Sequence, residues 1–302
     1  MTTKQHREIY NKNLLHPWGD LSELGNDESS SVIVKGKGIH IFDSDGNKMI
    51  DGPAGMWCMQ TGYGRKEIAD AVSKQILSLS YATSFTLIND KETELAKRIS
   101  EQTPGDLNRI YFTTGGSTAV DSALRLCQLA NNIKGASNKK QIITREKAYH
   151  GSTYLSASVT GKERDKTAMD VKREGIHFLK APCHFYYPEF DNEDDFCDFL
   201  INELEEKIIE IGPENIMAFI AEPILASGGV IVPPKNYNYR CWEVVKRYNI
   251  IYIADEVVTA FGRLGYWFAS EHVFGIIPDI IIFAKGITSG YIPMGGYAVS
   301  EK

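Results

Sequence analysis

Short apolar runs that alternate with helical segments are the feature that most limits the folds open to this chain. Beyond Pro104, runs such as RIYFTT, IMAFIAEP and IIYIADE are separated by stretches in which apolar residues recur at helical intervals, as in YRCWEVVKRYN. Strands that are buried on both faces and joined by helices are typical of a mostly parallel, doubly wound sheet. We therefore predict that residues 56–302 form a large α/β domain.

The first 55 residues show a different pattern. A polar arm is followed, from Ser31 to Gly52, by short segments in which apolar and polar residues alternate, and Asp45-Gly46 is a hairpin turn signal. Residues 1–55 are therefore expected to form an N-terminal arm and a small strand meander. Helical spacing of apolar residues predicts two helices after the meander, in RKEIADAVSKQILSL and KETELAKRISEQ.

The composition argues against several classes of protein. The chain of 302 residues is 43% hydrophobic and 24% charged, and no apolar segment approaches roughly 18 residues, so membrane insertion is not expected. A formal net charge of -6 without a sustained basic patch argues against a nucleic-acid partner. The polar start and the five cysteines, which lack metal-type spacing, indicate a cytoplasmic protein with reduced thiols and no metal site. A small molecule is the expected partner.

Polar residues follow the predicted strands at the edge where ligands bind in sheets of this kind. Such ligands lie beyond the carboxyl ends of the parallel strands. Five predicted strands end in residues suited to binding or catalysis, namely the turn Gly115-Gly116-Ser117-Thr118, the pair Tyr149-His150, and the single residues Glu222, Asp255 and Lys285. We take the candidate site from these strand ends, at Gly116, Ser117, Tyr149, Glu222, Asp255 and Lys285.

The turn Gly115-Gly116-Ser117-Thr118 lies between a strand and a helix. Backbone N–H groups at the start of a helix, together with the helix dipole and a hydroxyl, can bind a phosphate. Ser117 or Thr118 could equally serve as the N-cap of the helix without any ligand. The turn matches neither the dinucleotide fingerprint nor the ATP-binding loop, so it gives no support to those functions.

Asp255 and Lys285 end two strongly apolar runs, IIYIAD and DIIIFAK, which place them thirty positions apart. A buried carboxylate needs a cationic partner, which a protonated pyridine nitrogen could supply, although Asp255 could instead cap a loop or a helix. Lys285 could form an imine with an aldehyde and then act as a base, because a partly desolvated amine loses its proton more readily. It could also extend out of the strand end into solvent.

Tyr149 and Glu222 are each open to two interpretations. The ring of Tyr149 could stack on a flat heterocycle or pack in the core. Glu222, which Pro223 follows directly, could bond the edge of a cofactor or cap a loop. Neither residue alone decides the function.

Taken together, these segments resemble the class III, fold-type I aminotransferases, which use pyridoxal 5'-phosphate. The resemblance spans nearly the whole chain and is most specific in the pair IIYIADEVVTAFGRLG and DIIIFAKGITSGYIPMGG. It implies that Asp255 contacts the pyridine nitrogen and that Lys285 holds the cofactor as a Schiff base. It also implies that the phosphate lies at Gly116 and Ser117, the cofactor ring at Tyr149 and the cofactor edge at Glu222.

The N-terminal part resembles the omega-amine:pyruvate branch of that family, in HPWGDLSEL and DGPAGMWCMQTGYGR. In this branch the tryptophan that corresponds to Trp57 lines the substrate pocket, and Phe85 corresponds to a pocket aromatic residue near the dimer interface. The resemblance also implies a homodimer, because each active site in the family borrows residues from the other subunit.

Three positions depart from the family pattern. Thr118 and Val120 stand where the GSEAN-type segment has glutamate and asparagine, which leaves the phosphate residues unchanged. Ser227 stands where relatives that use 2-oxoglutarate carry the second glutamate of EPxxxE. Without that glutamate to pair with a substrate-binding arginine, the expected acceptor is pyruvate. The expected donor is an omega-amino acid or an amine, such as taurine or beta-alanine.

The length of the chain leaves alternatives open. Family members extend further, into a C-terminal small domain that supplies a carboxylate-binding arginine, and the 302 residues end before it. The chain could therefore be a catalytically incomplete aminotransferase-like protein. An aminomutase or a decarboxylase on the same fold would share every residue of the candidate site. Because Trp57 favours a transaminase over those two enzymes, a transaminase is the leading expectation.

Overall fold

The structure of the protein, a computed structural model, describes residues 1–15, 25–26, 28–167 and 169–301. The segment HPWGDLSEL, which carries part of the family resemblance, lies outside the described residues. The chain divides into two compact units, Met1–Tyr81 and Ala82–Lys302. The sequence pattern placed this division after residue 55. The difference arises because the segment after the meander is tied back to it: the Tyr63 hydroxyl donates to Asp51 Oδ2 at 2.6 Å.

The first unit contains a small antiparallel sheet. The N-terminal arm begins as helix α1 (Thr3–Asn13), which the sequence pattern did not predict and which a reciprocal Thr2–Gln5 capping box starts. The meander follows, with sheet order β1-β2-β3, so the predicted strands are confirmed. The bounds of the remaining elements are β1 (Ile33–Lys37), β2 (His40–Asp43), β3 (Lys48–Ile50), α2 (Ala54–Trp57) and α3 (Lys66–Ser78).

One aspartate shapes the predicted hairpin at Asp45-Gly46. The carboxylate of Asp43 accepts bonds from the backbone N–H groups of Asp45 and Asn47 and from the Asn47 side chain. These bonds hold the pKa of the Asp43 carboxyl below its ordinary range, with the Asn47 side chain as the largest cause. Gly46 has φ of +89°, a conformation that favours glycine. The hairpin turn that Asp45-Gly46 predicts is therefore present in the structure.

The second unit is built on a seven-stranded sheet, in the order β4-β10-β9-β8-β7-β5-β6. Strands β5 to β9 pair in parallel, and β10 is antiparallel to both of its neighbours, β4 and β9. The strands are β4 (Arg109–Thr113), β5 (Gln141–Arg145), β6 (Ile176–Leu179), β7 (Ile216–Ala221), β8 (Ile251–Asp255), β9 (Ile280–Phe283) and β10 (Gly295–Val299). The predicted mostly parallel sheet is confirmed, although the sequence pattern did not predict β6.

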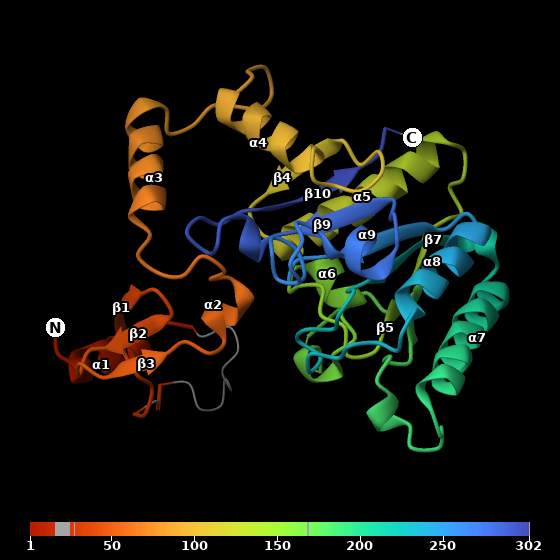
Figure 1. Ribbon diagram of the computed structural model, residues 1–302, viewed down its shortest axis with the longest axis horizontal. Helices are drawn as coiled ribbons and strands as arrows, with labels where there is room; N and C mark the ends of the chain where they lie inside the picture. Colours follow the sequence, from red (N-terminus) through yellow and green to blue (C-terminus); the bar gives the residue numbers. More distant parts are fainter. Residues whose placement is uncertain (16–24, 27, 168, 302) are drawn as a thin grey trace. The chain divides into compact units, whose positions relative to one another are not determined.

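Helices cover both faces of this sheet. The long helix α5 packs with α6 on one face, and α7 packs with α8 on the other, where Figure 1 shows them side by side. The helices and short 3-10 turns of the unit are α4 (Asp90–Ser100), α5 (Gly116–Ile133), α6 (Tyr154–Val159), η2 (Glu163–Asp165), η3 (His184–Tyr186), α7 (Glu193–Ile211), η4 (Pro213–Asn215), α8 (Tyr237–Arg247), α9 (Ala269–Phe274) and η5 (Lys285–Ile287). The predicted doubly wound architecture is therefore present.

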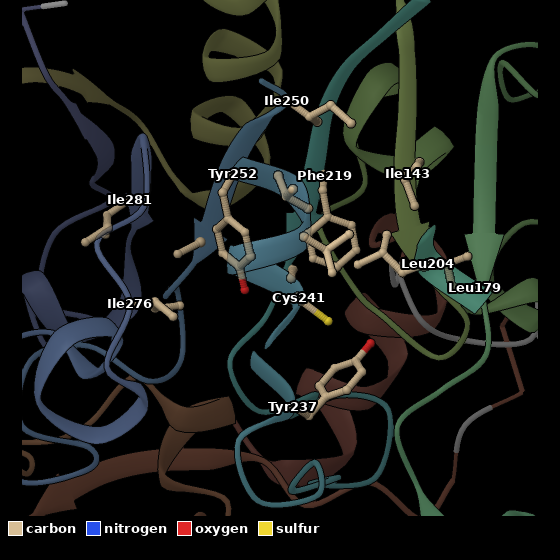
Figure 2. Close-up of a cluster of buried hydrophobic side chains, with 14 of the residues drawn as sticks. Ile143, Leu179, Leu204, Phe219, Tyr237, Cys241, Ile250, Tyr252, Ile276 and Ile281 are labelled. Carbon is tan, nitrogen blue, oxygen red and sulfur yellow. The ribbon is translucent and has the colours of Figure 1, made fainter. Parts of the chain in front are cut away.

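Alternate residues of each central strand enter opposite halves of the core. In β7, Phe219 packs toward α7 and α8, whereas Ile220 packs toward α5, and both are fully buried. Figure 2 shows Phe219 and Tyr252 meeting Cys241 and Tyr237 on the α8 side. Removing a buried phenylalanine side chain typically costs about 3–5 kcal/mol, so these strands are strongly fixed. No helix among the described residues is long and apolar enough to cross a membrane.

Candidate functional site

The strand order brings most of the predicted site residues to one edge of the sheet. β9, β8, β7 and β5 are consecutive neighbours, and parallel strands lie about 4.8 Å apart. Their carboxyl ends lead into Lys285, Asp255, Glu222 and Tyr149, respectively. Four separate segments of the chain therefore present their polar residues side by side, as the sequence pattern predicted.

Asp255 forms a buried pair with His150 at this edge. Asp255 Oδ2 lies 2.7 Å from His150 Nδ1, and each residue is only 3% exposed. The second oxygen, Oδ1, accepts a bond from the backbone N–H of Val257 at 3.2 Å, and His150 Nε2 lies 3.3 Å from the hydroxyl of Thr144. The imidazole therefore fixes the orientation of the carboxylate. Sequence reasoning did not assign His150 a role, because nothing local to EKAYHGST indicates that β5 lies close to β8.

Glu222 connects the exits of β5 and β7. Its Oε1 accepts a bond from the backbone N–H of Tyr149 at 2.8 Å, and its Oε2 accepts one from Ala226 at 3.1 Å. Burial raises the pKa of the Glu222 carboxyl to about 7; His150 opposes this rise, and the charge of Asp255 adds to it. Glu222 is therefore a proton-binding group near neutral pH. The loop-capping role that the sequence allowed is present in these two bonds.

Tyr149 lies beside a lysine that sequence reasoning missed. The ammonium of Lys162 lies 5.6 Å from the centre of the Tyr149 ring and donates to the Ser227 hydroxyl at 3.0 Å. It also lies 3.0 Å from Asp165 Oδ2. Tyr149 is half-buried, and this burial raises the pKa of its hydroxyl. Lys162 thus connects two predicted site residues, Tyr149 and Ser227, although nothing in the local sequence distinguishes it from other lysines.

The predicted phosphate turn begins helix α5. Gly115 is the N-cap residue, and no side chain caps this helix start. The Ser117 hydroxyl accepts a bond from the Ser152 backbone N–H at 3.1 Å, which leaves its own hydrogen available as a donor. A β-carbon on Gly151 would lie 2.6 Å from that hydroxyl, and Gly151 has φ of +137°. Glycine at 151 therefore allows the loop after β5 to approach the turn.

The phosphate turn also lies close to the exit of β9. A β-carbon on Gly116 would lie 3.6 Å from the side chain of Ala284, the residue before Lys285. Lys285 is half-buried and has φ of +43°, in the left-handed region that costs a residue with a side chain roughly 1–3 kcal/mol. Such strain is often found at functional sites.

Glu256, the neighbour of Asp255, faces the other side of the sheet edge. This fully buried carboxylate accepts bonds from the N–H groups of Ala269 and Ser270 and from the hydroxyls of Ser270 and Thr259. Burial raises the pKa of Glu256, although these donors oppose the rise. Glu256 therefore ties the loop after β8 to the start of α9. Sequence reasoning gave it no role.

Two predicted pocket residues remain predictions. Trp57 belongs to the first unit, where it is half-buried and has φ of +66°. Phe85 lies before α4 in the second unit and is 94% exposed. Among the described residues, no cluster of histidine, cysteine, aspartate or glutamate side chains could hold a metal ion.

Comparison with known proteins identifies the family. A putrescine–pyruvate aminotransferase of Pseudomonas aeruginosa is 40% identical over 99% of this chain and 66% of its own length. A diaminobutyrate–2-oxoglutarate transaminase of Halomonas elongata is 38% identical over 91% of this chain and 60% of its own. The crystal structure of an (S)-enantioselective omega-transaminase from Thermomicrobium roseum matches with a TM-score of 0.96 at 36% identity, over 100% of this chain and 67% of that one.

The chain spans less than two thirds of the length of these two curated relatives. The matched portion nevertheless includes the whole of the second unit and most of the first. Residues 22–302 match the family described as aminotransferase class-III. The fold, the strand-end residues and these comparisons agree, and the chain belongs to the class-III aminotransferases, a family that depends on pyridoxal phosphate.

Proposed function

We propose that the protein is an aminotransferase that moves an amino group from an omega-amino acid or an amine to pyruvate, with Lys285 binding the cofactor covalently. The observation that carries this proposal is the set of residues at neighbouring strand ends, with Lys285 after β9, Asp255 at the end of β8 and Glu222 after β7. Aminomutases and decarboxylases of the same fold would share this set. The experiment below therefore measures product as well as cofactor binding.

The residues of the site fit pyridoxal phosphate. A protonated pyridine nitrogen would compensate the buried charge of Asp255, which within the described residues is bonded to His150 and to the backbone N–H of Val257. The uncapped start of the 18-residue helix α5, with Gly116 and the Ser117 hydroxyl, suits a phosphate. The half-buried ring of Tyr149 lies at the exit of β5, where an aromatic ring suits contact with a heterocycle. When bound, this cofactor supplies an electron sink that stabilises negative charge on a substrate carbon.

The side chains of the chain would then orient groups and move protons. Once the substrate has displaced it, the Lys285 amine would act as a base. It would take a proton from the substrate carbon that bears the amino group and return it on the other side of the transferred nitrogen. His150 holds the Asp255 carboxylate in place at 2.7 Å, and Glu222 keeps the backbone of Tyr149 fixed at 2.8 Å.

Pyruvate is the proposed acceptor because of the surroundings of Ser227. Its hydroxyl accepts a bond from Lys162, so position 227 supplies no carboxylate to pair with an arginine. The Pseudomonas aeruginosa relative is named for pyruvate, whereas the Halomonas elongata relative is named for 2-oxoglutarate. Taurine, beta-alanine and putrescine are the donors to test first. We further propose that the protein is a cytoplasmic homodimer, and gel filtration would test the dimer.

The test begins with the visible spectrum of the purified protein after addition of pyridoxal phosphate. We expect the band of the covalently bound cofactor, an imine, in the wild type and its loss in Lys285→Ala. A band that survives in the variant would contradict the role of Lys285. Alanine formed from pyruvate and each donor is then measured. A wild-type band without alanine would favour a catalytically incomplete chain, whereas loss of carbon dioxide from beta-alanine, which carries a carboxylate, would favour a decarboxylase.

A further inference from the structure

Arg145, the last residue of β5, is a fully buried cation. One of its terminal nitrogens donates to the backbone carbonyl of Glu222. Its Nε and its other terminal nitrogen have no hydrogen-bond partner within the described part of the chain. A buried guanidinium costs free energy unless charges and acceptors compensate it. Its hydrogen bond to the chain that leaves β7 therefore suggests what this residue is for.

The Arg145 side chain lies on the face of the sheet opposite the candidate site. Its strand neighbour Ile143 points the same way and packs in the core under α7 and α8, whereas Thr144 points to His150. The guanidinium lies 5.9 Å from the centre of the Tyr237 ring at the start of α8. Figure 2 shows Tyr237 on this side of the strands. Arg145 therefore reaches Glu222 from beneath the site.

Asn238, on α8, supports the adjacent carbonyl. Its side-chain nitrogen donates to the carbonyl of Pro223 at 3.0 Å, and the residue is 2% exposed. The carbonyls of Glu222 and Pro223 thus each receive a buried side-chain donor just where β7 ends. Buried backbone carbonyls that leave a sheet need such partners. Meanwhile the carboxylate of Glu222 projects to the other face and bonds the N–H groups of Tyr149 and Ala226.

We infer that Arg145 and Asn238 are positioning residues of the site, which hold the exit of β7 from the opposite face so that the Glu222 carboxylate faces Tyr149 and His150. The inference rests on the proposed function only in giving Glu222 a place beside the cofactor. The positioning itself is a property of the chain without cofactor. It can therefore be measured separately.

The first test is hydrogen exchange of the protein without cofactor. Arg145→Met and Asn238→Leu remove the two donors, and Val244→Ala is the control, because Val244 is buried on α8 and its side chain has no hydrogen-bond donor. We expect the Ala226 amide to exchange about tenfold faster, relative to the core amide of Ile253, in both donor variants. Val244→Ala should not raise this ratio. Arg145→Lys, which keeps a donor, should restore part of the protection.

Unchanged ratios in Arg145→Met and Asn238→Leu would overturn the inference. If Arg145→Met does not fold, Asn238→Leu decides the result, because it introduces no change of charge. The second test is the dissociation constant of pyridoxal phosphate, measured from its visible band, which we expect to rise about tenfold in both variants. A wild-type protein without a band would contradict the proposed function. Unchanged exchange and affinity beside a normal wild-type band would contradict only the positioning role.

Discussion

His150 Nδ1 lies 2.7 Å from Asp255 Oδ2, although the two residues are 105 positions apart in the sequence. The pair forms because β5 and β8 lie on either side of β7, so that a side chain following β5 can reach the end of β8. A carboxylate held in this way has little freedom to rotate, since its other oxygen is bonded to the N–H of Val257. The charge of the Asp255 carboxylate is therefore held in a fixed position at the edge of the sheet.

The first prediction concerns this charge. Asp255→Asn removes it while keeping the shape of the side chain, so kcat/KM should fall on the order of a thousandfold. His150→Asn keeps a donor next to the carboxylate and should cost only about tenfold. Steady-state kinetics of both variants, at a pH where the wild type is fully active, checks that Asp255→Asn lowers kcat/KM more than His150→Asn does. If Asp255→Asn kept more than a tenth of the wild-type value, the assigned role of the carboxylate would be wrong.

The second prediction concerns stability and pH. The pKa of the buried Glu222 carboxyl is about 7, against an ordinary value of 4.5, so the folded state holds this proton more tightly than the unfolded state. The stabilisation from this group is therefore complete below pH 4.5 and is lost as the pH rises to about 7, by roughly 3 kcal/mol.

Urea unfolding between pH 4.5 and 8 measures this effect. Glu222→Gln should reduce the loss of unfolding free energy across this pH range by that amount, because glutamine does not titrate. Glu206→Gln, at an exposed position on α7, is the control and should leave the wild-type profile unchanged. Identical profiles for wild type and Glu222→Gln would show that burial does not perturb this carboxyl.

The third prediction distinguishes an effect on phosphate binding at the turn from an effect on the stability of the fold. Gly115 has φ of 171°, which any residue can adopt, and apart from its chain neighbours no described atom lies within 4 Å of where its β-carbon would be. Gly115→Ala should therefore unfold at the wild-type temperature. If a phosphate binds at the start of α5, the added methyl group should weaken pyridoxal phosphate binding about tenfold or more.

A matched variant is available in Gly52→Ala, where a β-carbon would also meet no described atom within 4 Å. It should leave both the unfolding temperature and the cofactor affinity unchanged. Cofactor titrations followed by absorbance give the comparison. Wild-type affinity in Gly115→Ala would place the phosphate elsewhere.

The fourth prediction concerns the carboxylate beside Asp255. Glu256→Ala leaves the N–H groups of Ala269 and Ser270 and the hydroxyls of Ser270 and Thr259 without their buried acceptor. The free energy of unfolding should fall by ~3 kcal/mol or more. Denaturant titration measures this loss, with the exposed Glu271→Ala on α9 as the control. A loss no larger than that of the control would mean that other groups hold the loop.

The sequence predicts much of this fold because its strands are short, apolar and separated by helical segments. Runs such as IIYIAD and DIIIFAK form mostly buried strands, and the residues that end them lie at one sheet edge, as expected. Helix α7 was not predicted, although Phe196, Leu200, Leu204 and Ile208 follow the helical spacing, so the signal was present. Strand β6 is only four residues long, and its His177 interrupts the apolar run.

The supporting residues of the site could not be predicted in the same way. Arg145 acts on Glu222 because β5 pairs with β7, and His150 acts on Asp255 because β8 lies beyond β7. These contacts depend on strand order, which no local pattern encodes. The residues that end strands are visible in the sequence, whereas those that hold them in place become visible only after the sheet is assembled.

Strand β10 determines when β4 can join the sheet during synthesis. Within the described sheet, β4 is hydrogen-bonded to β10 and to no other strand, so the turn that starts α5 joins the other strand ends through Gly295–Val299. A β-carbon on Gly295 would lie 2.7 Å from the backbone of Gly115, so the two segments meet closely. During synthesis β4 leaves the ribosome long before its partner, with an edge open to incorrect pairing. A nascent chain arrested before Gly295 would carry Asp255 and Lys285 but could not yet bring the phosphate turn into the same sheet.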